Sequence, residues 1–210
     1  GPVHAEGLDY VPARGPFFLI ANHQSLLDPI YIQAVCPRVL HTMTKSTQFA
    51  SPVLRWLLTR NYAFPVRRYE VDPQAVRVAL RRIAAGQGVC IYIEGERSWD
   101  GRLQPPRLGT VRLLLKAGAP VVPCAIQGSY DVLPRWDTRL RRAPVRIRFG
   151  PPLRFPRLDR RADRESALPE AARRVHQALA ALLDAAPPDT PPADPQAARP
   201  MTVPSAARYP

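Results

Sequence analysis

Short apolar runs alternate with helix-like segments along most of this 210-residue chain, and this alternation limits the folds open to it. Runs of five or six residues predict strands at Phe17–Ala21, Val39–Met43, Tyr62–Val66, Val89–Ile93, Val121–Ile126 and Val145–Phe149. Longer segments, three of which open with proline, predict helices at Pro29–Val35, Pro52–Thr59, Pro73–Ala85, Leu108–Ala117 and Glu165–Asp184. Strands that alternate with helices of roughly ten residues favour an α/β fold with a mostly parallel central sheet flanked by helices. Pro123 predicts that its strand lies at an edge of this sheet or contains a bulge.

The end of the chain differs from the rest in composition. Residues 187–210 are rich in proline and alanine, and such a segment buries too little apolar surface to offset the entropy lost on ordering. We therefore expect a single domain at residues 1–186 and a flexible tail at residues 187–210.

The chain is strongly basic. It has 30 Lys and Arg against 17 Asp and Glu, a net charge of +13, and only Lys45 and Lys116 are lysines. The surplus reflects either a compositional bias of the source genome or a surface that attracts polyanions, such as an acidic bilayer face or nucleic acid. The arginines are scattered, and no helix-turn-helix, zinc-finger or RNA-binding motif accompanies them, so nucleic acid is not an expected partner.

Two further features narrow the class of protein. No apolar run approaches the ~20 residues needed to cross a bilayer, so the chain is not expected to span a membrane. Cys36, Cys90 and Cys124 are far apart in apolar sequence and form no Cys-x-x-Cys pair. This pattern predicts reduced thiols in the core of a cytosolic domain and no metal site.

A run of polar residues that includes His23 and Asp28 follows the first predicted strand. We expect Asp28 to be the N-cap of the next helix, with Pro29 at the first helical position. The carboxylate of Asp28 would then fold back onto the imidazole of His23, fix its tautomer and make it a general base. The alternative is that Asp28 only caps the helix and that His23 is an ordinary loop residue.

A charged turn, Glu94-Gly95-Glu96-Arg97-Ser98, follows the fourth predicted strand. Gly95 permits an unusual backbone conformation or the close approach of a ligand to main-chain N–H groups. Arg97 can bind a phosphate, and Glu94 can hold Arg97 or bind a hydroxyl group. The alternative is a charged surface turn stabilised by local ion pairs.

Basic residues follow two other predicted strands. Lys45 comes after the second strand, and Arg67-Arg68 come after the third. The carboxyl ends of parallel strands share one edge of a sheet, so we expect these groups to converge with His23 and Arg97 on a single cleft.

These segments resemble the 1-acylglycerol-3-phosphate acyltransferase family, glycerolipid acyltransferases that have a His-x4-Asp motif. The four resembling blocks are Asn22-His23-x-Ser25-x-x-Asp28, Phe64-Pro65-Val66-Arg67-Arg68, Glu94-Gly95-x-Arg97-Ser98 and Val122-Pro123-Cys124-Ala125-Ile126. They lie in the family's order and at similar spacing, and the resemblance runs from about Gly7 to Gly128.

The resemblance implies the family's α/β fold and an O-acyltransferase of phospholipid biosynthesis. Such an enzyme moves a fatty acyl group from acyl-CoA or acyl-carrier protein to a lysolipid hydroxyl, above all that of 1-acylglycerol 3-phosphate, without a cofactor or metal. Alternatives are a different lysolipid or hydroxylated lipid as acceptor, or a non-catalytic lipid-binding relative.

The resemblance also implies roles for individual residues. His23 is the general base and Asp28 its orienting partner. The acceptor phosphate is bound by Arg68, Glu94, Gly95 and Arg97. We further hypothesise that Lys45 and the Gly95 amide stabilise the thioester oxyanion.

Glu96 departs from the family pattern, which usually has threonine there. A carboxylate ~4–6 Å from a phosphate repels it by about 1 kcal/mol when well solvated. Arg67 can offset this repulsion, the side chain can point away, or the acceptor can be a different lipid.

Attachment to an anionic membrane surface, on its cytoplasmic side, is the expected location. The protein would be peripheral or anchored by a segment absent from this chain. Phe49, Trp56 and Leu57 are candidate insertion residues, with a core position as the alternative for Trp56.

Overall fold

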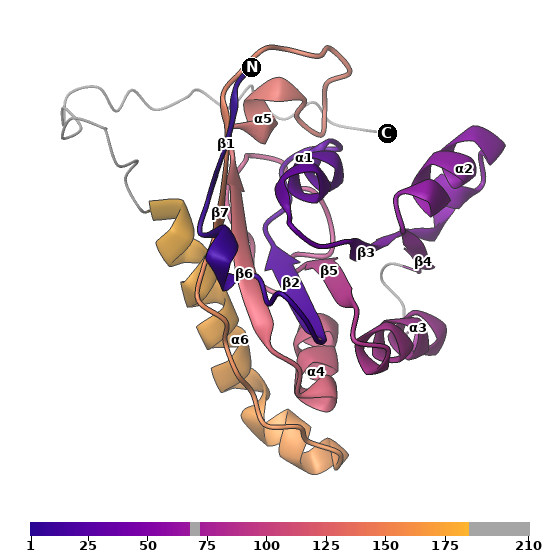
Figure 1. The fold of residues 1–210 in the computed structure, drawn as a ribbon, viewed down its shortest axis with the longest axis vertical. Coiled ribbons are helices and arrows are strands. Elements are labelled where there is room, and N and C mark those ends of the chain that lie inside the picture. The colour runs from indigo at the N-terminus through magenta and orange to yellow at the C-terminus, as the bar shows by residue number, and fades with distance from the viewer. Residues whose placement is uncertain (68–71, 185–210) are drawn as a thin grey trace, which may run out of the picture.

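Seven strands form one sheet in the computed structural model of this protein, which describes residues 1–67 and 72–184 (Figure 1). They lie in the order β1-β7-β6-β2-β5-β3-β4, and every neighbouring pair is parallel except β6 and β7. The strands are β1 (Val3–Glu6), β2 (Phe17–Ala21), β3 (Leu40–Lys45), β4 (Phe64–Val66), β5 (Gly88–Tyr92), β6 (Val121–Gln127) and β7 (Val145–Phe149). The prediction of a mostly parallel α/β sheet is confirmed.

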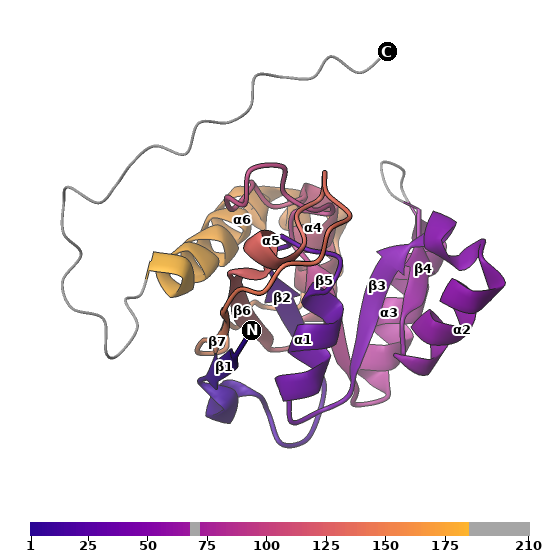
Figure 2. The same cartoon turned by 90° about the horizontal axis from the view of Figure 1, so that it is seen from above.

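Helices cover both faces of this sheet (Figure 2). They are α1 (Asp28–Val35), α2 (Pro52–Arg60), α3 (Pro73–Ala84), α4 (Leu108–Ala117), α5 (Ser129–Val132) and α6 (Arg161–Asp184), with short 3-10 helices η1 (Leu8–Tyr10) and η2 (Ser46–Phe49). Side chains of β2 alternate between two cores: Phe18 and Ile20 pack with α3, α4 and α6, whereas Phe17 and Leu19 pack with α1. Because β2 is buried on both faces, its sequence is continuously apolar.

Pro123 does not lie at an edge of the sheet, because β6 is central, between β7 and β2. The irregular pairing lies opposite β6 rather than in β6 itself. Val121 and Cys124 are three positions apart, whereas their partners Leu153 and Phe149 are four positions apart, so the opposing segment carries one extra residue. Proline has no N–H to donate, and the break in regular pairing accommodates it.

The expectations about the cysteines, the tail and a membrane-spanning segment are taken in turn. The thiols of Cys36, Cys90 and Cys124 are buried and form no disulfide, as predicted, and burial raises the pKa of Cys90 to about 12. The predicted tail at residues 187–210 and the end of the predicted domain lie outside the described residues. Within the described ranges, no helix combines the length and hydropathy that crossing a bilayer requires.

Gly88, the first residue of β5, provides a test of the packing beneath the site. A Cβ atom there would lie 2.7 Å from the buried ring of Phe17, whereas at Gly109 in α4 it would meet nothing within 4 Å. We expect Gly88→Ala to lower the free energy of unfolding by about 1–3 kcal/mol, because overpacking displaces the ring. The control Gly109→Ala should leave that energy unchanged or raise it by up to about 1 kcal/mol. Urea unfolding of both variants measures this, and equal effects would contradict the packing described.

Candidate active site

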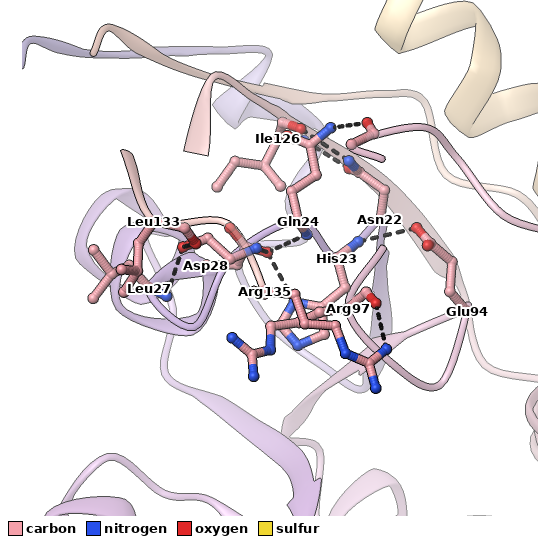
Figure 3. Close-up of polar contacts among 12 residues, drawn as sticks. Asn22, His23, Gln24, Leu27, Asp28, Glu94, Arg97, Ile126, Leu133 and Arg135 are labelled. Atoms are coloured by element: carbon pink, nitrogen blue, oxygen red, sulfur yellow. Dashed lines mark hydrogen bonds and ion pairs between the residues drawn. The ribbon is translucent and has the colours of Figure 1, made fainter. Parts of the chain in front are cut away.

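His23 and Asp28 form a buried pair at the carboxyl end of β2 (Figure 3). Nδ1 of His23 lies 2.8 Å from Oδ2 of Asp28, and the two side chains are 8% and 0% exposed. The imidazole also stacks on the ring of Tyr92, with 3.9 Å between the ring centroids. Because the carboxylate holds Nδ1, the ring is fixed in orientation with its Nδ1 side toward Asp28.

The carboxylate of Asp28 turns back toward the loop that precedes it. Leu27 is the N-cap of α1 and Asp28 is already helical, so the prediction that Asp28 is the N-cap was wrong. Oδ2 accepts hydrogen bonds from the N–H groups of Gln24 (2.7 Å) and Ser25 (2.8 Å) in addition to its contact with His23. These bonds solvate a buried charge and fold the loop so that the imidazole meets the carboxylate.

The Glu94–Ser98 turn is hydrogen-bonded to the main chain of His23. Oε1 of Glu94 accepts from the N–H of His23 (3.0 Å), and the N–H of Ser98 donates to the carbonyl of His23 (2.8 Å). Both bonds join the loop after β2 to the turn after its neighbour β5. The structure therefore brings together two of the segments that the sequence predicted to converge.

Asn22 and Ser25 hold the same loop from its other side. Nδ2 of Asn22 donates to the carbonyl of Ile126 (2.9 Å), and its Oδ1 accepts from the N–H of Ile126 (2.8 Å). Oγ of Ser25 donates to the carbonyl of Leu133 (2.9 Å). Sequence reasoning missed these anchoring roles, because spacing along the chain does not show which distant main-chain group a side chain will meet.

Gly95 has a left-handed backbone (φ 76°), and its N–H donates to the carbonyl of Tyr92 (3.0 Å). The N–H that we expected to face an oxyanion is therefore already used within the turn. A Cβ at this position would lie 2.9 Å from Cγ of Arg107, whose Nε donates to the carbonyl of Glu94 (3.1 Å). Gly95 thus makes room for an arginine side chain of the protein itself.

Glu96, the residue expected to repel a phosphate, is paired with two arginines. Its Oε1 lies 3.0 Å from Nη2 of Arg107, and its Oε2 lies 2.8 Å from Nη1 of Arg135. Arg67, suggested from the sequence as the compensating charge, has its Nε 3.7 Å from Asp72. The negative charge of Glu96 is therefore offset by residues that the sequence did not single out.

Arg97 is half-buried near the His23–Asp28 pair. Burial lowers the pKa of its guanidinium, and the nearby positive charge of Arg135 lowers it further, whereas the negative charge of Asp28 raises it. Within residues 1–67 and 72–184, no group accepts a hydrogen bond from this guanidinium. A partly desolvated cation in this state is suited to binding an anion.

A cavity of about 640 Å³ adjoins the turn. Glu94, Arg97 and Arg107 supply polar groups to its lining, and Trp99 and Leu108 supply apolar surface. The carboxyl groups of Glu96 and Asp100 also line it, so an anionic group attached to an apolar body fits this lining at the Arg97 guanidinium. A second cavity, of about 650 Å³, is lined by residues around the amino-terminal end of β3, including Arg38, His41 and Tyr62, away from the His23 loop.

Lys45 is a predicted site residue that is not placed directly beside His23. Lys45 ends β3, which is separated from β2 by β5, so two strand spacings put it about 10 Å from the β2 loop. Its oxyanion role stays a prediction. Arg68 lies outside the described residues. Among the residues that are described, no group of three or more His, Cys, Asp and Glu could hold a metal ion.

Comparison with known proteins shows which family the chain belongs to. Residues 2–127 match the Acyltransferase family, and this segment contains His23, Asp28 and the Glu94–Ser98 turn. The chain belongs to the Acyltransferase family. The resemblance seen in its motifs is thereby confirmed.

Several curated relatives are similar over much of the chain. The chloroplastic 1-acyl-sn-glycerol-3-phosphate acyltransferase BAT2 of Brassica napus is 32% identical over 134 residues, 61% of this chain and 38% of its own. The enzyme of that name from Bacillus subtilis is 27% identical over 129 residues, 61% of this chain and 64% of its own. The chain thus spans about two fifths of the length of the plant relative.

A solved structure shares the fold. The crystal structure of the 1-acyl-sn-glycerophosphate acyltransferase PlsC from Thermotoga maritima matches with a TM-score of 0.71 and 22% identity, over 89% of this chain and 74% of that one. At this identity the match supports the fold.

Burial makes Glu94 an unusual acid. Its side chain is almost inaccessible, and burial raises its pKa to about 8, although hydrogen bonds from the N–H groups of His23 and Gln104 lower it. The negative charges of Asp28 and Asp100 raise it further. Near neutral pH the folded protein therefore favours the protonated carboxyl.

The raised pKa of Glu94 predicts a pH dependence of stability. Between the ordinary value of 4.5 and about 8, the unfolded chain releases this proton and the folded protein keeps it. The folded state should therefore lose on the order of 3 kcal/mol as the pH rises from about 5 to about 8. Glu94→Gln keeps an acceptor for the His23 N–H and should remove this slope.

Urea unfolding at several pH values across this range measures the effect. The control is Glu170→Gln, an exposed residue of α6 that should keep the wild-type slope. The same slope in Glu94→Gln and the wild type would contradict the burial effect.

Proposed function

We propose that this chain is an O-acyltransferase that moves a fatty acyl group from an acyl thioester to the hydroxyl of a lysolipid, with 1-acylglycerol 3-phosphate as the acceptor. The donor is acyl-CoA or acyl-carrier protein, and the reaction belongs to phospholipid biosynthesis. The observation that carries the proposal is the 2.8 Å contact between His23 and Asp28 beside the half-buried Arg97. Membership of the Acyltransferase family and the names of the similar proteins support it.

His23 acts as the general base in the proposed reaction. Its Nε2 takes the proton of the acceptor hydroxyl as the oxygen attacks the thioester carbonyl. When the tetrahedral intermediate collapses, the C–S bond breaks and the imidazolium returns the proton to the sulfur. Asp28 stabilises the imidazolium, and a positioned base contributes ~10²–10⁴ in rate. This chemistry requires no metal or prosthetic group.

Lys45 is retained as the proposed oxyanion donor. A donor of this kind contributes ~10²–10³ in rate. The Gly95 N–H is not part of the proposal, because it donates to the carbonyl of Tyr92.

The acceptor phosphate is proposed to bind at Arg97, together with Arg68 and the cavity beside Glu94. A phosphate monoester supplies a hydrogen-bonded negative charge, which the Arg97 guanidinium lacks among the described groups. Because Arg107 and Arg135 pair with Glu96, its carboxylate is no obstacle to a phosphate acceptor. A neutral lysolipid would leave Arg97 without a counter-charge, so phosphate-bearing acceptors are favoured.

Replacement of His23 tests the base. We expect His23→Ala to lower kcat by ~10²–10⁴ and to leave the dissociation constant for 1-acylglycerol 3-phosphate near the wild-type value, because the imidazole acts on the hydroxyl proton. A labelled acyl thioester measures turnover, and calorimetry measures binding. The control His176→Ala, in α6, should retain turnover. A His23→Ala variant with near-normal kcat would overturn the assignment.

We also propose that α2 attaches the protein to an anionic membrane surface on its cytoplasmic side. The helix has no buried residue, and the exposed fractions of Val53, Leu54, Trp56 and Leu57 are 74%, 45%, 60% and 43%. The core alternative for Trp56 was therefore wrong, while Phe49 is partly buried. No acidic residue lies between Asp28 and Glu70, so the apolar side chains lie in a basic segment. Apolar groups among arginines favour an anionic bilayer surface.

Sedimentation with vesicles tests this attachment. We expect Trp56→Glu to weaken binding to vesicles of mixed phosphatidylcholine and phosphatidylglycerol about tenfold, because it removes apolar contact and adds a negative charge. Tyr10→Glu, at a 45% exposed aromatic residue in η1, is the control and should bind as the wild type does. Wild-type binding that ignores anionic lipid and salt would contradict the proposal.

A further inference from the structure

Arg135 reaches the site from a segment outside the four motifs. It follows α5, in the connection between β6 and β7, and lies beyond the residues 2–127 that match the family. Its side chain is 23% exposed. Figure 3 shows Arg135 together with Arg97 and the His23 loop.

Three contacts fix the guanidinium of Arg135. Nη1 donates to Oε2 of Glu96 (2.8 Å) and to the carbonyl of Arg97 (2.9 Å). The guanidinium carbon lies 4.1 Å from the centroid of the Trp99 ring. One side chain therefore holds the carboxylate of one residue of the turn and the main chain of the next.

The contact with Glu96 matters because Glu96 and Arg97 are neighbours in the turn. A carboxylate within reach of a guanidinium competes with an anionic ligand for it. Here, Arg107 binds one oxygen of Glu96 and Arg135 binds the other. The charge of Arg135 also acts directly on Arg97, so the two cations together attract an anion.

We propose that Arg135 is a positioning residue for the acceptor phosphate: it occupies the Glu96 carboxylate and holds the Arg97 main chain, which keeps the Arg97 guanidinium available to the phosphate. This inference rests on the proposed function and adds a residue to it. The acceptor it concerns is a phosphate monoester on a lipid or glycerol body.

Replacement of Arg135 and of its partner tests the inference. We expect Arg135→Gln to raise KM for 1-acylglycerol 3-phosphate about tenfold, with kcat and KM for the acyl thioester near wild type, because Glu96 then captures Arg97. In the double variant Glu96→Gln with Arg135→Gln, this KM should return toward the wild-type value. A purely structural role predicts the opposite, because the double variant loses more of the turn's contacts than the single one.

The control is Arg139→Gln, an exposed residue of the same connection, which should keep wild-type KM values. Equal KM values in Arg135→Gln and Arg139→Gln, or a double variant no better than Arg135→Gln, would overturn the inference.

Binding of glycerol 3-phosphate, measured by calorimetry without an acyl donor, separates the two proposals. A wild type that binds it but transfers no acyl group to any lysolipid contradicts the proposed function, and weaker binding by Arg135→Gln still supports the inference. Equal binding by both proteins, or no binding by the wild type, overturns the inference.

Discussion

The geometry of the site depends on two hydrogen bonds that join the main chain of His23 to the turn after β5. Oε1 of Glu94 accepts from the N–H of His23, and the N–H of Ser98 donates to its carbonyl. A loop residue held at both main-chain groups has a fixed Cα–Cβ direction, which decides where its side chain starts. The contact with Asp28 then fixes the ring, so the imidazole is in place before any ligand binds.

The fold was most predictable where burial alone decides the sequence. The segment Phe17–Ala21 is a strand with the predicted bounds, because both faces of β2 are covered and every position must be apolar. Val3–Glu6 was missed, since β1 is an edge strand with no fully buried residue and no apolar run. The place of Pro123 in a central strand depends on a bulge, which is a property of two segments together.

The sequence identified the residues of the site better than it identified their hydrogen-bond partners. His23 and Asp28 were recognised together because they are five residues apart, within reach of one turn. The cap role given to Asp28 was wrong because its carboxylate bonds to N–H groups that precede it. The bond from the His23 N–H to Glu94 joins residues 71 positions apart, and no local pattern indicates it. Arg135 belongs to no motif, so only the folded chain shows where it lies.

The antiparallel direction of β7 relative to β6 affects how the sequence of such a protein can diverge. Because the two strands are antiparallel, their connection starts and ends at the same rim of the molecule, where the His23 loop also lies. Substitutions or insertions in that connection leave the strand pairing intact, yet they alter which side chains stand next to the Glu94–Ser98 turn. Headgroup preference can therefore diverge among related proteins without any change to the His23–Asp28 pair, and this connection is where such divergence is easiest to accommodate.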